Sequence, residues 1–303
     1  MKTSNHLLRR LTAALLAAVL ALSIALPVFA SDDGDTIYIN SVSDLLSLAR
    51  SCAYDQWSVG KTVILQKDLS LEGMLWEPIP SFSGQFKGNG HTISDLTITG
   101  QYSPAGLFGI VEEQGSIESL SVRGVVSVSD SADTTTGGIA GVNHGTLISC
   151  QFTGVVTGDS EVGGIVGRNE SEGTIDHSTA RAIVTGKSST GGIAGYNLGA
   201  ITGCTNVGSI NTEYPEASLD TDGFTAKMVD YINNKMAAAD DDATNSVTNV
   251  ATDTGGIAGR SSGMILTSVN TGTIGYEHVG YNVGGIVGRT DGLVSGCVNQ
   301  GRV

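Results

Sequence analysis

A five-residue phrase, Gly-Gly-Ile followed by Ala or Val and then Gly, recurs along this chain and constrains its fold more than any other feature. There are five full copies and a degenerate one at Ala105–Gly109, and their second glycines fall at positions 106, 138, 164, 192, 256 and 285. The steps between them are 32, 26, 28, 64 and 29 residues, so only one step departs from a period near 28. Repeats of this length predict a solenoid, in which each unit buries its apolar face against its neighbours.

Counting forward from the second glycine gives three positions per repeat that are apolar and mostly β-branched. They lie one, nine and eighteen residues on, once a two-residue insertion near 170–172 is allowed. The first position holds Leu107, Ile139, Ile165, Ile193, Ile257 and Ile286, the second Leu147, Ile175, Ile201, Ile265 and Val294, and the third Val156, Val184, Ile210, Ile274 and Val303. Separated by Gly, Asn, Ser and Thr, these positions predict three short strands that meet at turns.

Helical repeats are excluded because each unit holds roughly three glycines, and a glycine inside a helix costs about 0.8–1 kcal/mol. Propeller blades are disfavoured because their usual tryptophan and aromatic marks are absent from the repeats. The remaining solution is an all-β fold, a three-sided parallel β-helix whose coils lie about 4.8 Å apart. Parallel crossovers are right-handed in nearly all proteins, so we predict a right-handed coil.

The repeats resemble a known family at this point. The phrase Gly-Gly-Ile-Ala-Gly, followed by Asn and then by Ile-x-x-Cys-x-Asn-x-Gly, is similar to the GLUG-motif repeat of secreted bacterial surface proteins and of the non-catalytic part of immunoglobulin-A-specific metallopeptidases. The segment from Phe82 to Ile93 similarly resembles the first coils of pectin-lyase-like β-helices. The resemblance covers roughly residues 60–303, and it implies a scaffold rather than an activity.

The first 30 residues have the pattern of a secretory signal peptide. Lys2, Arg9 and Arg10 precede an uncharged apolar run, and Val28-Phe29-Ala30 fits a cleavage site. Cleavage would take the formal net charge from −14 to about −17 and leave no membrane segment. A body this acidic is not expected to bind nucleic acid, which requires Lys and Arg to neutralise phosphates.

Two segments interrupt the repeat pattern. Residues 31–60 predict a strand and a short amphipathic helix, N-capped by Ser41 or Ser43 and burying Leu45, Leu46 and Leu48, which would cover the open edge of the first coil. The β-helix would then run over 61–303, with a helical insertion within 211–252. Since the last repeat stops at Val303 with no covering segment, we expect further domains C-terminal to this chain.

The cysteines predict no disulfide. Cys150, Cys204 and Cys297 share one position of the repeat, and Ser178 and Ser268 fill it in the coils between them. Cysteines two coils apart are separated by roughly 9–10 Å, beyond the Cα limit of about 7 Å for a disulfide. We therefore expect buried free thiols, and no cofactor or metal.

Asparagines recur at two other positions of the repeat. Stacked amides can hydrogen-bond from coil to coil and satisfy buried turn backbone. We expect two ladders, one of Asn143, Asn169 and Asn197 and one of Asn206, Asn270 and Asn299.

An outward stripe is expected four residues after the second glycine. It holds Ile110, Val142, Arg168, Tyr196, Arg260 and Arg289. Tyrosine can stack on a sugar face and arginine can bind a carboxylate, so Arg168, Tyr196, Arg260 and Arg289 form the one candidate binding surface, for an extracellular glycan or a host or matrix protein. An ordinary solvated stripe is the alternative.

Three functions stay open at this stage. The first is a secreted, non-enzymatic surface, adhesion or spacer segment. The second is a carbohydrate-active β-helix enzyme, but that chemistry requires opposed carboxylates, and here the acids fall in loops, while Asp176 and His177 would point to opposite faces of a strand. The third is the N-terminal, non-catalytic part of a larger secreted peptidase, since no His-Glu-x-x-His sequence occurs.

Overall fold

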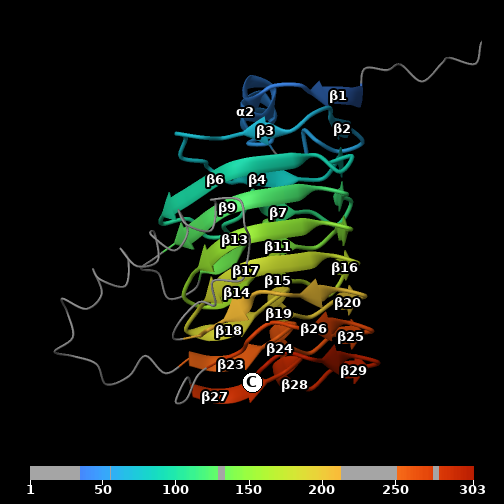
Figure 1. The fold of residues 1–303 in the computed structure, drawn as a ribbon. Coiled ribbons are helices and arrows are strands. Elements are labelled where there is room, and N and C mark those ends of the chain that lie inside the picture. The colour runs from blue at the N-terminus through green and yellow to red at the C-terminus, as the bar shows by residue number, and fades with distance from the viewer. Residues whose placement is uncertain (1–34, 55, 129–133, 213–250, 276–279) are drawn as a thin grey trace, which may run out of the picture. The chain divides into compact units, whose positions relative to one another are not determined.

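The structure, a computed structural model, describes residues 35–54, 56–128, 134–212, 251–275 and 280–303. The predicted signal peptide and the predicted helix of the insertion, at 224–239, lie outside these residues. The described body is a parallel β-solenoid that contains one helix, and it confirms the predicted all-β fold. Figure 1 shows the coils stacked on one another, with α2 (Val42–Ser51) and β1 at one end of the stack.

The strands form four sheets, and every paired neighbour within them is parallel. Sheet A consists of β1 (Thr36–Ile39), β2 (Thr62–Leu65), β5 (Gln85–Lys87), β8 (Ser116–Glu118), β12 (Thr146–Ile148), β16 (Thr174–Asp176), β20 (Ala200–Thr202), β25 (Met264–Leu266) and β29 (Leu293–Ser295). Sheet B consists of β3 (Leu69–Ser70), β6 (Thr92–Gly100), β9 (Ser121–Val128), β13 (Gln151–Thr157), β17 (Thr179–Thr185), β21 (Thr205–Asn206), β26 (Val269–Asn270) and β30 (Val298–Asn299), and β22 (Ser209–Ile210) also pairs with β17.

The other two sheets meet at the glycine phrase. Sheet C consists of β4 (Ile79–Phe82), β7 (Phe108–Val111), β11 (Ala140–Asn143), β15 (Val166–Asn169), β19 (Ala194–Asn197), β24 (Ala258–Ser261) and β28 (Val287–Thr290). Sheet D consists of β10 (Thr135–Gly137), β14 (Glu161–Gly163), β18 (Ser188–Gly191), β23 (Ala251–Gly255) and β27 (Gly280–Gly284). Sheet D adds a fourth strand to five of the coils, beyond the three per coil that the sequence predicts.

The glycine phrase is the bend between sheets D and C. Its first glycine ends a strand of sheet D, its fourth residue begins a strand of sheet C, and the Gly-Ile between them turns the chain, as at Gly138-Ile139. The last glycine is required because the two sheets approach closely there. A Cβ added to Gly195 would collide with the backbone at Glu161–Val162 of β14, one coil earlier, so no larger residue fits without moving backbone.

Equivalent residues of successive coils stack in files, as the repeat alignment predicts. Leu147 pairs with Ile175, which pairs with Ile201 and so on through Ile265 to Val294. The isoleucines of the glycine phrase hydrogen-bond through their backbones, from Ile139 N to Ile165 O and onward in the same way to Ile286. All but the last of these isoleucines are fully buried.

The N-terminal end of the stack is closed by α2. Ser41 caps this helix, accepting a hydrogen bond from the Asp44 amide at 3.2 Å, which is one of the two caps expected. Leu45 and Leu48 are buried, and Leu46 is partly buried against the same core. Beneath the helix the core is aromatic, since the rings of Phe82, Phe86 and Phe108 lie 5.3–6.2 Å apart between centroids.

Candidate functional site

The predicted outward stripe is a continuous file on sheet C. Its members occupy paired positions on successive strands and run from Ile110 through Val142, Arg168, Tyr196 and Arg260 to Arg289. The pairing of β4 with β7 adds Ser81 at the N-terminal end of the file. Neighbouring side chains of this file lie one coil apart, close enough to contact each other.

Arg168 is held by two carboxylates. Its Nη1 lies 2.7 Å from Glu161 Oε1, and its Nε lies 2.7 Å from Glu170 Oε1. Burial alone would lower the pKa of Arg168, but Glu161 and Glu170 together raise it above its ordinary value. The guanidinium is therefore charged and already neutralised by its neighbours, which leaves it little capacity to bind an anionic ligand.

Tyr196 lies between two arginines. The Cζ atoms of Arg168 and Arg260 each lie 5.1 Å from the centre of its ring. Because these arginines stand on the strands to either side of β19, they cover opposite faces of the ring. The predicted stacking of a sugar on the Tyr196 ring would require one of these arginines to move away. The Tyr196 hydroxyl lies 3.3 Å from Ser262 Oγ.

Arg260 and Arg289 are the more open end of the stripe. Asp291 lies beside them, and its pKa is lowered first by a hydrogen bond from Ser262 and then by the charges of Arg260 and Arg289. The ion pairs of the stripe in the described residues are thus those of Arg168 with Glu161 and Glu170. Arg168 and Tyr196 are already partnered, whereas Arg289 is exposed at the open end.

The asparagines stand in two hydrogen-bonded files. Asn143 Nδ2 donates to Asn169 Oδ1 at 2.7 Å, Asn169 Nδ2 to Asn197 Oδ1 at 2.8 Å, and Asn197 Nδ2 to Ser261 Oγ at 3.0 Å. In the second file Asn206 Nδ2 donates to Asn270 Oδ1 at 2.7 Å, and Asn270 Nδ2 to Asn299 Oδ1 at 2.6 Å. Each of these amides except Asn299 is fully buried, and each also bonds a turn carbonyl such as Gly173 O.

The four cysteines are free, and Cys52, Cys150 and Cys204 are buried. Cysteine and serine alternate along one file, in which the Cys150 amide donates to Ser178 Oγ at 3.1 Å and the Ser178 amide to Cys204 Sγ at 3.4 Å. The thiols of Cys150 and Cys204 donate to backbone carbonyls of Ile117 and Ile175. These contacts describe packed polar residues and no redox pair.

Burial gives the thiols a measurable pH dependence. Burial raises the pKa of both Cys150 and Cys204 from the ordinary 9.0 to about 12. The folded chain therefore keeps these protons at pH values where the unfolded chain loses them, so their contribution to stability is complete below pH 9 and is lost as the pH rises towards 12. We expect the double variant Cys150→Ser/Cys204→Ser to lose less of its free energy of unfolding than the native chain does between pH 9 and pH 11. Urea denaturation at a series of pH values measures this.

Thiol labelling provides the companion measurement. At neutral pH a thiol reagent is expected to modify the half-buried Cys297 first, and Cys150 and Cys204 only after unfolding. Serine is a matched replacement because Ser178 and Ser268 occupy the same file in the alternate coils. Rapid labelling of Cys150 in the folded chain would contradict the burial described here.

Asp176 and His177 contact each other, contrary to the expectation that they point apart. β16 ends at Asp176, and His177 adopts a φ of 46°, which brings its Nδ1 to 2.8 Å from Asp176 Oδ1. The side chain of the histidine is 68 % exposed, so the contact lies on the surface. Within the described ranges, no group of three His, Cys, Asp or Glu side chains could hold a metal ion.

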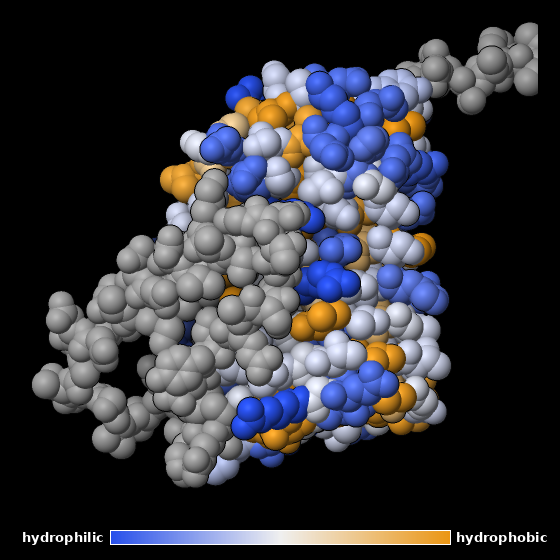
Figure 2. All heavy atoms as spheres, viewed as in Figure 1, coloured by the Kyte–Doolittle hydropathy of each residue, from blue (hydrophilic) through white to orange (hydrophobic). Residues whose placement is uncertain are grey.

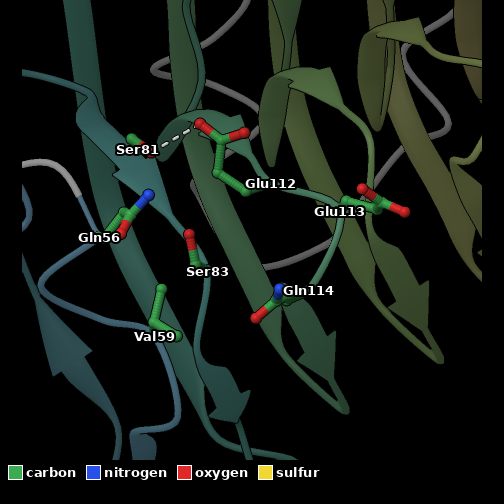
Figure 3. A pocket seen from close by; sticks show the side chains of 7 residues that line it. All are labelled: Gln56, Val59, Ser81, Ser83, Glu112, Glu113 and Gln114. Carbon is green, nitrogen blue, oxygen red and sulfur yellow. Dashed lines mark hydrogen bonds between the residues drawn. The ribbon is translucent and has the colours of Figure 1, made fainter.

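A pocket that the sequence pattern does not predict lies beside Ser81, at the N-terminal end of the stripe (Figure 3). It has a volume of about 510 Å³. Its lining comes from the segment after α2, the end of β4 and the turn after β7, and consists of Gln56, Val59, Ser81, Ser83, Glu112, Glu113 and Gln114. Ser83 is buried at the floor, Ser81 and Glu112 are half-buried, and the other four are exposed at the rim. Ser81 Oγ donates to Glu112 Oε1 at 2.7 Å.

Comparisons with known proteins gave two partial sequence relatives and one similar solved structure. No family model matches the chain, so the resemblance to the GLUG repeat rests on the residues quoted above. Halomucin of Haloquadratum walsbyi is 32 % identical over 155 residues, which cover 47 % of this chain and 2 % of halomucin. A "Putative Gly-rich membrane protein" of Evansella cellulosilytica is 29 % identical over 137 residues, or 33 % of this chain and 16 % of that protein.

The solved structure of a "putative immunoglobulin A1 protease" from Bacteroides ovatus has a similar fold. The TM-score is 0.58 at 18 % sequence identity, and the match covers 88 % of this chain and 78 % of that one. None of the helices in the described part of the chain is long and apolar enough to cross a bilayer. The chain spans only small fractions of the lengths of the two sequence relatives. It shares the β-helix architecture of the solved structure.

Proposed function

We propose that this chain is a secreted, non-enzymatic β-solenoid segment that acts at the cell surface as a spacer or adhesion element. The observation that carries the proposal is that the middle of the outward stripe, at Arg168 and Tyr196, is already occupied by contacts within the chain. Arg168 is paired with Glu161 and Glu170, and Tyr196 is enclosed by Arg168 and Arg260. A stripe whose central side chains are held by one another leaves little chemistry there for a substrate.

The surface and the relatives support the same reading. On the face shown in Figure 2, apolar residues lie scattered among polar ones, as expected for a surface exposed to water. The partial relatives are named halomucin and a putative Gly-rich membrane protein, and residues 1–30 have the pattern of a signal peptide, which favours a location at or outside the membrane. A GLUG-type repeat, which we propose on the quoted residues, fits the same location.

Exposure on intact cells and an absence of turnover test this proposal together. We expect an antibody against the chain to label intact producing cells, and treatment of those cells with an added protease to remove the label. The purified chain is expected to release no new reducing ends or unsaturated products from a panel of polysaccharides. Turnover that is abolished by Glu161→Gln or Glu112→Gln would instead establish the carbohydrate-active enzyme.

A second candidate function is the non-catalytic part of a larger secreted peptidase. It is favoured by the fold shared with the Bacteroides ovatus protein, whose description names a protease. This candidate expects the isolated chain to leave immunoglobulin A1 intact and the chain to be found covalently continuous with a peptidase in the secreting cell. Mass spectrometry of the secreted product distinguishes it from a spacer with no peptidase attached.

Replacing Tyr196 tests whether the stripe is a structural network. Tyr196→Ala removes two cation–π contacts, each worth about 0.5–1 kcal/mol at an exposed site, so the free energy of unfolding is expected to fall by about 1–2 kcal/mol. Tyr196→Phe keeps the ring and should have a much smaller effect. Tyr281, which is 70 % exposed, serves as the control, and Tyr281→Ala is expected to change stability by less than about 0.5 kcal/mol. Equal effects of the two alanine variants would argue against the network.

A further inference from the structure

We propose that the pocket at the N-terminal end of the stripe binds a neutral, hydroxyl-rich ligand of the sugar class. The proposal stands on the pocket's own residues and does not depend on the surface role proposed above. Its lining presents two hydroxyls, two amides and two carboxylates around a volume of about 510 Å³. That volume lies within the roughly 300–1,000 Å³ typical of small-molecule sites.

The floor of the pocket holds a hydroxyl without a protein partner. Ser83 is only 9 % exposed, and its backbone amide donates to Ser58 Oγ at 2.9 Å, but among the described residues its own Oγ makes no hydrogen bond. In Figure 3 this hydroxyl points towards Ser81 and Gln56 across the pocket. Ser83 Oγ does not belong to the fully buried side-chain atoms that lack a partner, so it faces the solvent of the pocket. A ligand hydroxyl placed in the pocket would take the place of water as its partner.

One wall offers a carboxylate that is already oriented. Ser81 Oγ donates to Glu112 Oε1, which fixes the carboxylate and leaves Oε2 as an acceptor. Gln56 and Gln114 add amide groups at the rim, each of which can donate and accept. A fixed carboxylate accepts hydrogen bonds from hydroxyl donors, and amides bond hydroxyls in either sense. Together, the Glu112 carboxylate and the two amides match a ligand that carries several adjacent hydroxyls.

The charge of the lining selects against other ligand classes. Glu112 and Glu113 are the charged members, and neither Lys nor Arg lines the pocket, so an anionic ligand would be repelled. Val59 is the one apolar member, so a largely apolar ligand would leave the polar groups unpaired. A Ca²⁺ ion needs six to eight oxygen ligands at 2.3–2.6 Å, and the described chain holds no cluster of three candidate metal-binding side chains. A neutral polyol can bond the hydroxyls and amides as well as the carboxylates, whereas a small organic cation would pair with Glu112 and Glu113 alone.

The pocket is built before any ligand arrives. The Glu112 amide donates to Phe82 O at 2.9 Å, which ties the turn after β7 to the end of β4. The Val59 amide donates to Gln56 O at 3.1 Å, and the Gly115 amide to Glu112 O at 2.8 Å, so each rim segment is closed by its own turn. A preformed site loses little conformational entropy on binding.

The test is a titration of the full chain with small probes, followed by saturation-transfer NMR and calorimetry. The neutral probes are glucose, galactose, mannose and N-acetylglucosamine, the anionic probe is galacturonate, and the cationic probes are Ca²⁺ and ethanolamine. We expect saturable binding of at least one neutral sugar, and weaker binding of galacturonate and of both cations. Ser83→Ala and Glu112→Gln are each expected to weaken sugar binding by about tenfold.

Two further measurements keep the proposal falsifiable. Because the Ser83 hydroxyl has no protein partner, Ser83→Ala is expected to leave the thermal midpoint of the free chain unchanged or higher, which a structural role would not allow. Ser116→Ala and Glu118→Gln, on β8 outside the pocket, should bind sugar as the native chain does. The proposal is overturned if no neutral probe binds, if only Ca²⁺ or ethanolamine binds, or if Ser83→Ala and Glu112→Gln leave sugar binding unchanged.

Discussion

Gly195→Ala is expected to lower the free energy of unfolding by about 3 kcal/mol or more, the upper end of what overpacking costs. The added Cβ would lie 2.5 Å from the backbone carbon of Glu161, and still closer to the Val162 amide. Both obstacles are backbone of the preceding coil, so they cannot rotate away as a side chain would. Relief requires sheets C and D to separate locally. Urea denaturation followed by circular dichroism measures the loss.

Gly109 provides a matched control within the same motif. It is the last glycine of the degenerate first copy, and a Cβ there would lie 3.1 Å from Pro80 O and 3.3 Å from Ile79 O. Those contacts need shifts of only a few tenths of an ångström, and alanine in a strand gains about 0.5–1 kcal/mol over glycine. Gly109→Ala should therefore stay within about 1 kcal/mol of the native chain. If both variants unfold at the same urea concentration, the close approach of sheets C and D does not explain why the last residue of the phrase is glycine.

Asn169→Ala is the second substitution with a large expected effect. It removes the donor to Asn197 Oδ1 and Gly173 O, and the acceptor of Asn143 Nδ2, all of which are buried. A buried polar group left unsatisfied costs about 1–3 kcal/mol, so a loss of about 3 kcal/mol or more is expected. Hydrogen exchange should show the loss first in the turns at Gly145 and Gly173, whose carbonyls the ladder binds.

Asn299 is the control for the ladder. It accepts from Asn270 Nδ2 at 2.6 Å as Asn169 accepts from Asn143, but its side chain is exposed, so water can replace what is lost. Asn299→Ala is expected to cost less than about 1 kcal/mol. A similar cost at both positions would mean that the buried amides contribute by packing and not by their hydrogen bonds.

The period of the glycine phrase was enough to predict the coils and the files of Leu147 and Ile139, because parallel strands place equivalent residues over one another. The positions that follow the second glycine do not predict sheet D, because its strands come before that glycine. Counting two residues back would have found Thr136, Val162, Thr190, Thr254 and Val283, a β-branched file that pairs throughout sheet D. The signal was present in the sequence and short enough to overlook.

The candidate sites were harder to predict for a physical reason. Register placed Arg168, Tyr196 and Arg260 side by side, but whether their side chains turn outward to solvent or onto each other depends on local charges such as Glu161. The pocket joins Gln56 and Ser83, which precede the first copy of the glycine phrase, to Glu112, which follows β7, and the turns beside α2, β4 and β7 bring them together. Periodicity carries no information about residues that occur once.

Both asparagine files run in one sense, with every Nδ2 directed towards the C-terminal coil and every Oδ1 towards the N-terminal coil. The amide dipoles therefore add along the stack and give it a polarity that a parallel sheet alone would lack. A coil laid down in the opposite sense would bring two amide groups together donor to donor. Any extension of this stack, by more of the same chain or by another copy, has to be head to tail, as monomers add to a polar filament.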